Sequence, residues 1–284
     1  MKLLHTLLVT TVIATSSAAY AAGEHSSGHS APAASHEVMG HGSATHEEIT
    51  VKLSLKPIAP LQAGKTSQVI LTLNDVANGK PLSFNDLKEA HTRKLHLLIV
   101  DPSLSDYHHI HPTTGKNAGE YVFDFTPKKN DRYRVWADVI PVATGKQDYV
   151  KADVGSAASN KTAIDKISSL VSTVDGYTFT LALDSEPKAG AAVMGNIIIT
   201  KDGKPFTLLE PVMGAFAHVV GFTEDYNSVL HIHPMGKEPT SDTERGGPKL
   251  EFHIEPKTAG FVKLFAQVKI GGKDIFAPFG VIVK

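Results

Sequence analysis

The chain contains no cysteine among its 284 residues. This absence excludes disulfide bonds, thiolate metal ligands, a cysteine nucleophile and a blue-copper centre built on a cysteine ligand. The net charge is −1 with histidine neutral, so no basic surplus is present to bind nucleic acid or an anionic membrane. The sequence also lacks a glycine-rich phosphate loop, a nucleophile elbow and a carboxylate pair suited to acid–base catalysis. These absences favour a binding protein over an enzyme.

The N-terminus has the features of a secretory signal. Lys2 supplies a positive charge, the apolar stretch 3–14 is too short to span a bilayer, and the Ala-Tyr-Ala sequence at 19–21 fits a cleavage site. We therefore expect residues 1–21 to be a signal peptide and the protein to be periplasmic or secreted. No later run is long and apolar enough to predict a membrane span.

Residues 22–47 form a low-complexity segment that should be disordered, because it has too few apolar residues to bury a core. A flexible histidine-rich tract binds borderline cations loosely and releases them by exchange. The tail therefore predicts metal capture, and the alternative is a solvated spacer that is rich in histidine. The side chains concerned are His25, His29, His36, Met39, His41 and His46.

A histidine pattern occurs twice in the chain. His96 stands thirteen residues before His109, which opens a His-Ile-His-Pro sequence that continues through His111 and ends at Pro112. Over these 17 positions, the second copy is identical only at the three histidines, the isoleucine and the proline. Its residues, at a constant offset of 122, are His218, His231, Ile232, His233 and Pro234. A duplicated domain that keeps its imidazoles indicates a site, and imidazole trios most often bind metals.

Alternation of apolar and polar residues predicts short strands along most of the chain. The alternation begins near Ile49 and starts a second time near Tyr177. Short strands separated by turn residues over about 100 residues are typical of an immunoglobulin-like sandwich. We predict an all-β protein with two tandem immunoglobulin-like β-sandwich domains, residues 48–153 and 173–284, joined by a linker at 154–172.

The alignment of the two copies continues into a later strand. Residues 123–139 match residues 252–268 without gaps. Trp136 and Phe265 occupy the same place in this alignment, and we expect both to be core aromatics.

Strand geometry predicts how each histidine trio converges. Residues i and i+2 of a strand point to the same face about 6–7 Å apart, so His109 and His111 can share one ion. Pro112 should end the strand or force a turn, and a hairpin would bring His96 alongside the pair. The second trio should do the same, which gives one site per domain. Three neutral imidazoles suit copper, zinc or nickel, and affinity favours copper.

One further correspondence favours copper. His91 of the first copy aligns with Met213 of the second at the offset of 122. Imidazole and thioether can replace one another as ligands of copper, particularly of Cu(I), whereas a thioether is a poor ligand for zinc. We therefore include His91 and Met213 among the candidate metal ligands.

The stretch from Leu95 to Asp101, followed by the His-Ile-His-Pro sequence at 109–112, resembles the YtkA-like and related immunoglobulin-like domains of exported bacterial proteins. Some members of that group are associated with copper handling. The resemblance covers roughly residues 48–153 and 173–284. It implies a β-sandwich, export and a role in copper handling.

Three functions fit these patterns. The first is a non-enzymatic periplasmic protein for copper binding, tolerance or delivery, whose partners would be metal ions and another periplasmic metal-handling protein. The second is a structural or adhesive pair of sandwiches whose histidines brace loops. The third is a copper-dependent oxidoreductase, because His-x-His strands also occur in copper/zinc superoxide dismutases and cupins. Against the third, no glutamate follows His111 or His233 at the cupin spacing.

Overall fold

Strands form where the alternation predicts them, because one face of each strand is apolar. In β1 (Val51–Pro57), Val51 and Leu53 are buried while Lys52 and Ser54 are exposed. The computed structural model describes residues 49–159, 162–232 and 234–284, and for residue 231 it describes the backbone alone. The predicted signal peptide and histidine-rich tail lie outside the described residues.

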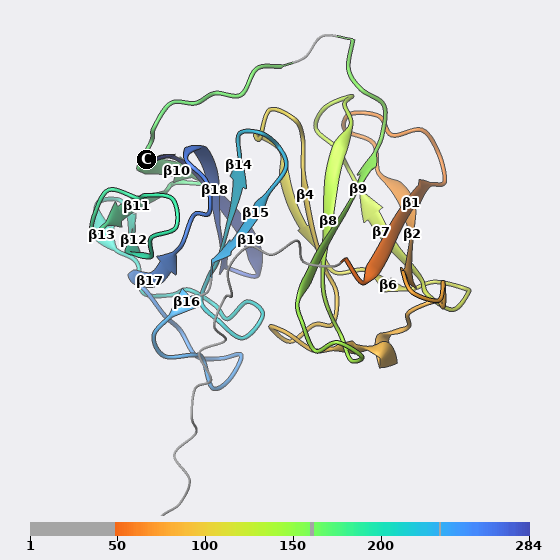
Figure 1. Ribbon diagram of the computed structural model, residues 1–284. Helices are drawn as coiled ribbons and strands as arrows, with labels where there is room; N and C mark the ends of the chain where they lie inside the picture. The colour runs from red at the N-terminus through yellow and green to blue at the C-terminus, as the bar shows by residue number, and fades with distance from the viewer. Residues whose placement is uncertain (1–48, 160–161, 233) are drawn as a thin grey trace, which may run out of the picture. The chain divides into compact units, whose positions relative to one another are not determined.

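The first domain is a sandwich of two antiparallel sheets (Figure 1). One sheet has the order β1-β2-β7-β6, and the other has the order β3-β8-β4-β5 with β9 also paired to β8. A short 3₁₀ helix, η1 (Phe84–Asp86), precedes β3. The strands after β1 are β2 (Ser67–Asp75), β3 (Leu87–Lys88), β4 (His96–Val100), β5 (Tyr107–Ile110), β6 (Thr113–Thr114), β7 (Glu120–Phe125), β8 (Tyr133–Pro141) and β9 (Asp148–Val154).

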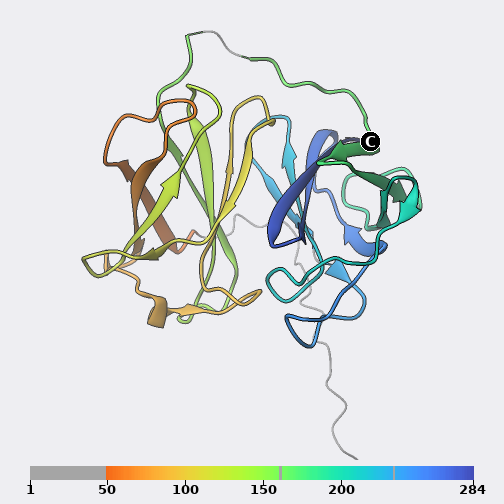
Figure 2. The ribbon, with the colours of Figure 1, turned by 180° about the vertical axis from the view of Figure 1, so that it is seen from behind.

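The second domain repeats this plan. One sheet has the order β10-β11-β12-β17-β16 with β13 also paired to β12, and the other has the order β15-β14-β18-β19 (Figure 2). The strands are β10 (Val171–Val174), β11 (Tyr177–Leu183), β12 (Val193–Lys201), β13 (Lys204–Pro205), β14 (His218–Thr223), β15 (Val229–Ile232), β16 (Pro234–Met235), β17 (Lys249–Ile254), β18 (Gly260–Ile270) and β19 (Lys273–Val283). The protein is thus all-β with two repeated sandwich domains, as predicted.

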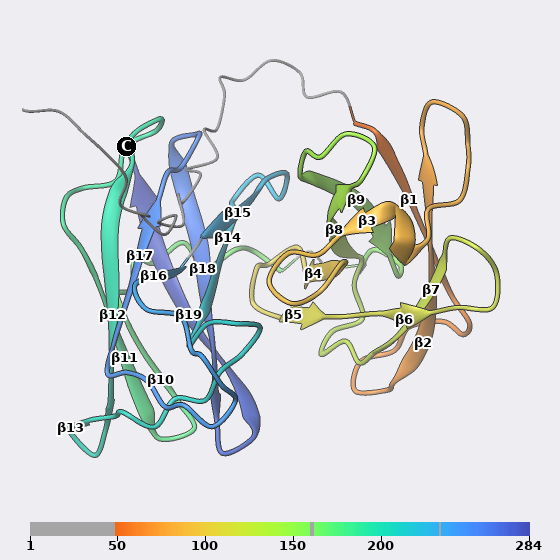
Figure 3. The same ribbon diagram turned by 90° about the horizontal axis from the view of Figure 1, so that it is seen from below.

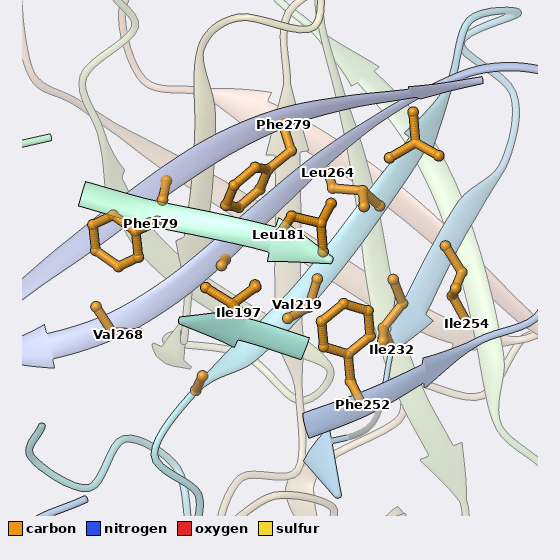
Figure 4. Packing of buried hydrophobic residues seen from close by; sticks show 14 of the residues in the cluster. Phe179, Leu181, Ile197, Val219, Ile232, Phe252, Ile254, Leu264, Val268 and Phe279 are labelled. Atoms are coloured by element: carbon orange, nitrogen blue, oxygen red, sulfur yellow. The ribbon is translucent and has the colours of Figure 1, made fainter. Parts of the chain in front are cut away.

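Each domain has its own apolar core between its two sheets. In the second domain, Phe179 and Ile197 of one sheet face Leu264 and Phe279 of the other (Figure 4), and all four side chains are fully buried. Burial of one such side chain stabilises the fold by about 1.5–3 kcal/mol. The core of the first domain is built in the same way around Leu71, Leu97 and Phe123. No helix in the described part of the chain is long and apolar enough to cross a membrane.

Strand β4 is buried on both faces, and its second face contacts the other domain. Leu97 and Ile99 belong to the core of the first domain, whereas Leu98 and Val100 belong to a third apolar cluster. This interdomain cluster joins Leu98, Val100, Leu104, Tyr107 and Trp136 to Val220, Phe222 and Phe265. Strands β14 and β15 accordingly lie beside β4 (Figures 1 and 3).

Trp136 and Phe265 are both core aromatics, as predicted. Both side chains are buried in the interdomain cluster and not between the two sheets of their own sandwich. The reason is strand alternation: Val135 and Ala137 point into the first core, so Trp136 between them must point out of it. An outward-facing tryptophan is buried only because the second domain covers it.

The His-Pro sequence marks the point where the chain passes from one sheet to the other. β5 belongs to the sheet of β4, and β6, which begins one residue after Pro112, belongs to the sheet of β7. The second domain repeats the crossing between β15 and β16, and Pro234 is the first residue of β16. Proline has no backbone N–H to continue a ladder, so it suits a residue at such a break.

Candidate metal centre

The structure brings together the three histidines of the first copy. His96 begins β4, His109 lies in β5, and His111 follows β5 at the sheet crossing. The Nδ1 atom of His96 is 3.2 Å from Nε2 of His109 and 3.0 Å from Nε2 of His111. One nitrogen of each ring lies within 4.8 Å of the corresponding nitrogens of the other two. We refer to His96, His109 and His111 as the triad.

The pairing of β4 with β5 produces this convergence. Leu97 lies opposite Ile110 and Leu98 opposite His109, so His96 comes next to His111 at the end of the ladder. All three rings leave the sheet on the face that carries Leu98, which is the face turned toward the second domain. The triad therefore lies at the domain interface and outside the core of its own sandwich.

The other nitrogens of two triad rings are held by acceptors. His96 Nε2 donates to the carbonyl oxygen of Ala90 at 2.9 Å, and His109 Nδ1 donates to Oε1 of Gln267 at 2.8 Å. A carbonyl oxygen can only accept, so each of these nitrogens carries the proton and the opposite nitrogen carries a lone pair. The lone pairs of His96 Nδ1 and His109 Nε2 thus face one another, which is the arrangement that a bound cation would stabilise.

Two of the triad rings, those of His109 and His111, are neutral at neutral pH. Burial lowers the pKa of His109 well below its usual 6.5, and the charges of His111 and His96 add to the effect. Burial also lowers the pKa of His111 to about 4, with further contributions from His96 and Arg93. Because a metal binds the deprotonated ring nitrogen, these shifts keep the ligand atoms available.

The acceptor for His96 comes from a tight turn at residues 90–93. Its central residues, His91 and Thr92, have positive φ values of 50° and 65°, and Ala90 pairs with Arg93 across the turn. Two successive residues in the left-handed region define the two-residue turn that best joins adjacent antiparallel segments. The turn fixes the Ala90 carbonyl under the His96 ring.

The second domain builds the same support. Met213 and Gly214 have φ values of 50° and 78°, and Val212 pairs with Ala215. The Nε2 atom of His218 donates to the carbonyl oxygen of Val212 at 3.0 Å, as His96 does to Ala90. Met213 is partly buried and occupies the turn position that His91 occupies in the first domain.

Two of the remaining predicted ligands, His91 and His218, lie beside the triad. His218 is 1% exposed, and its ring centroid is 5.3 Å from that of His91 and 6.5 Å from that of His109. The His91 ring is 6.2 Å from that of His96. The side chains of His231 and His233 lie outside the described part of the structure. A role for these two as metal ligands stays a prediction.

Gln267 is a site residue that the sequence reasoning missed. It is 4% exposed on β18, where it pairs with His218, and its counterpart in the first domain is Asp138, which pairs with His96 on β8. At both positions a buried polar residue stands between two buried apolar neighbours in the strand. That shared polar position in the two aligned copies was the available signal.

The fold and the histidine site describe a tandem β-sandwich protein with a candidate metal centre at its domain interface. A family model described as a domain of unknown function (DUF8832) matches residues 44–157 and again residues 172–284. The chain belongs to this family and contains two copies of its domain. No curated protein matches the chain.

Solved structures of several bacterial proteins are similar at low identity. The D00-D0 domain of intimin is 12% identical, with 82% of this chain and 100% of that chain covered and a TM-score of 0.21. Domains 4 and 5 of the S-layer protein SbsC give 12% identity, coverage of 82% and 97%, and a TM-score of 0.21. Trypsin-activated alpha-2-macroglobulin from Escherichia coli gives 13% identity and a TM-score of 0.27, with 82% of this chain and 15% of the macroglobulin chain covered.

Proposed function

We propose that this protein is an exported, non-enzymatic metal-binding protein that holds copper at the triad. The observation that supports the proposal is the convergence of three imidazole nitrogens within 4.8 Å, two of them on rings whose other nitrogen donates to a fixed acceptor. Metal-ligating histidines usually donate their second N–H to a carbonyl or carboxylate oxygen, which sets the tautomer and the ring orientation.

The donor set favours copper over the alternatives. Three neutral imidazoles bind copper, zinc and nickel, and the affinity order of divalent ions places copper highest. With the predicted signal peptide and histidine-rich tail, such a site suits copper binding, tolerance or delivery in the periplasm or outside the cell. A partner would then be another metal-handling protein that supplies or receives the ion.

Metal titration of triad variants tests this proposal. The mature chain, with its five tail histidines replaced by asparagine in every sample, is titrated with Cu(II), Zn(II) and Ni(II) against a competing chelator. We expect copper to bind most tightly. His96→Ala, His109→Ala and His111→Ala should each lower the copper affinity by more than the roughly 10- to 100-fold typical of outer-sphere changes. His253→Ala, on a strand face outside the triad, should bind as the parent does.

A second candidate function rests on the same hydrogen bonds. His96 and His218 both donate to a turn carbonyl, so the histidines could serve to brace the turns of a structural or adhesive protein. That function predicts triad variants that lose stability in urea although the parent protein binds no metal. Such a result, or full copper affinity in all three alanine variants, would reject the copper proposal.

A further inference from the structure

His91 and His218 come from different domains and lie side by side. Their ring centroids are 5.3 Å apart with the ring planes at 80°. Within the triad, ring centroids are 4.9, 4.9 and 5.4 Å apart. The centroid distance between His91 and His218 is therefore within the range found among the triad rings. We propose that His91 and His218 bind a second copper-class ion across the domain interface, beside the ion of the triad.

The orientation of His218 supports this role. Its Nε2 donates to the Val212 carbonyl, which can only accept, so its Nδ1 carries the lone pair. His96 has the same arrangement with Ala90, and its Nδ1 is the atom that points to the other triad nitrogens. The two histidines are also equivalent in strand register, because His96 pairs with Asp138 and His218 with Gln267. Nδ1 of His218 is thus the ligand atom.

The turn at 90–93 carries His91 to the interface. This turn and the turn at 212–215 approach each other closely, since a Cβ atom at Gly214 would lie 3.5 Å from Cγ2 of Thr92. The His91 ring is nearer to His218 than to His96, at 5.3 Å against 6.2 Å. His91 is therefore the partner of His218 in the second site, and the two-residue turn holds His91 at this position.

Buried charge at the interface is compatible with two cations. Asp138 is 3% exposed and pairs with His96 on the face that contacts the second domain, so it adds a negative charge close to the triad. Its Oδ1 accepts a hydrogen bond from Nε2 of Gln147 at 2.8 Å, which holds the carboxylate in place. A buried carboxylate offsets part of the repulsion between neighbouring ions.

Copper stoichiometry tests the second site. This inference rests on the proposed function, because it assumes the same imidazole–copper chemistry. The mature chain with tail histidines replaced by asparagine is titrated with Cu(II) under chelator competition, and electron paramagnetic resonance records the bound ion. We expect two equivalents in the parent. His91→Ala and His218→Ala should each bind one equivalent with the triad spectrum, and His96→Ala should lose the triad spectrum and keep the other.

The design separates this inference from the proposed function. One equivalent in the parent, lost in His96→Ala and unchanged in His91→Ala, would overturn the second site and leave the triad proposal intact. No tight binding in the parent would overturn both. His253→Ala is the matched control and should keep two equivalents. Circular dichroism in the presence of a chelator shows whether each variant is folded. If the variant of the buried His218 unfolds, the variant of the partly exposed His91 decides the test. Two equivalents of copper in a folded His91→Ala protein would reject the inference.

Discussion

Gln267 of the second domain sets the tautomer and the orientation of the His109 ring in the first domain. Its Oε1 accepts from His109 Nδ1 at 2.8 Å, which directs the lone pair of His109 Nε2 toward His96. Without that acceptor the ring could turn or change tautomer, and one of the three ligand atoms would be lost from the triad. The side chain acts through His109, so we regard Gln267 as a positioning residue.

Replacement of Gln267 should therefore weaken copper binding without removing a ligand. We expect Gln267→Ala to lower copper affinity by about 10- to 100-fold, the range typical for outer-sphere partners of metal-ligating histidines. Gln267→Glu should restore most of the affinity, since a carboxylate also accepts from Nδ1. Titration under chelator competition measures both. Gln68→Ala, at an exposed glutamine on β2, is the control, and equal affinity in the Gln267→Ala protein would contradict the assignment.

Residue spacing predicts contacts within a hairpin but not contacts between domains. The repeated His-x-His pattern places His109 and His111 on one face, and the short loop after β4 brings His96 to them. The distance between His109 and Gln267, which are 158 residues apart in the chain, depends on how the two sandwiches pack. The alignment likewise assigned His91 to its own domain, whereas its ring lies nearer to His218.

At the level of elements, the loop between β14 and β15 forms hydrogen bonds with the last residue pair of the β4–β8 ladder in the first domain. Val100 pairs with Arg134 at the end of β4 and β8. The hydroxyl of Tyr226 donates to the Val100 carbonyl at 2.7 Å and accepts from the Arg134 backbone N–H. The Arg134 guanidinium also lies over the Tyr226 ring, 4.6 Å from its centroid. One tyrosine thus binds two strands of the neighbouring domain.

Tyr226→Phe should destabilise the protein because it leaves both backbone groups without this partner. Loss of a partner to a buried backbone group costs about 1–3 kcal/mol, and we expect a decrease in the free energy of unfolding within that range. Urea denaturation measures it. Tyr177→Phe, whose hydroxyl contacts only the exposed Lys201 among the described residues at 3.4 Å, should change stability by less than about 0.5 kcal/mol. Equal effects of the two changes would contradict this role.

The alternation of each strand was sufficient to predict the sandwiches, but it could not say what covers their outer faces. Val135, Ala137 and Val139 form the apolar stripe of β8 that faces the first core. Trp136 lies on the opposite face and is buried by residues of the second domain. A sequence pattern records that both faces are apolar, while the identity of the covering element depends on the packing of the whole chain.

At the level of the whole molecule, residues 47–284 form one compact unit in which the two domains share an apolar cluster and the histidine site. The apolar cluster stabilises the contact at any pH. The histidines add a dependence on pH, because burial lowers the pKa of His109 and His111 below 6.5 in the folded protein. In the unfolded chain these rings bind protons near pH 6.5.

The metal-free protein should therefore lose stability as the pH falls from about 6.5 toward about 4. Above that window both states hold neutral rings, and within it the unfolded state binds more protons, so unfolding becomes more favourable. Urea denaturation in the presence of a chelator at several pH values measures the slope. His111→Gln cannot bind that proton, so its stability should fall less steeply than that of the parent. Identical slopes would show that the His111 pKa, lowered to about 4, has no part in the acid sensitivity.

The passage of the chain between sheets at Pro112 has a mechanical consequence. His109 belongs to one sheet of the first sandwich, and His111 precedes the short strand of the other. An ion held by both would cross-link the two sheets and, through Gln267, the adjacent domain. Under a stretching force the copper-loaded protein would resist separation of the two sheets and of the two domains. Removal of the triad ion would remove this cross-link.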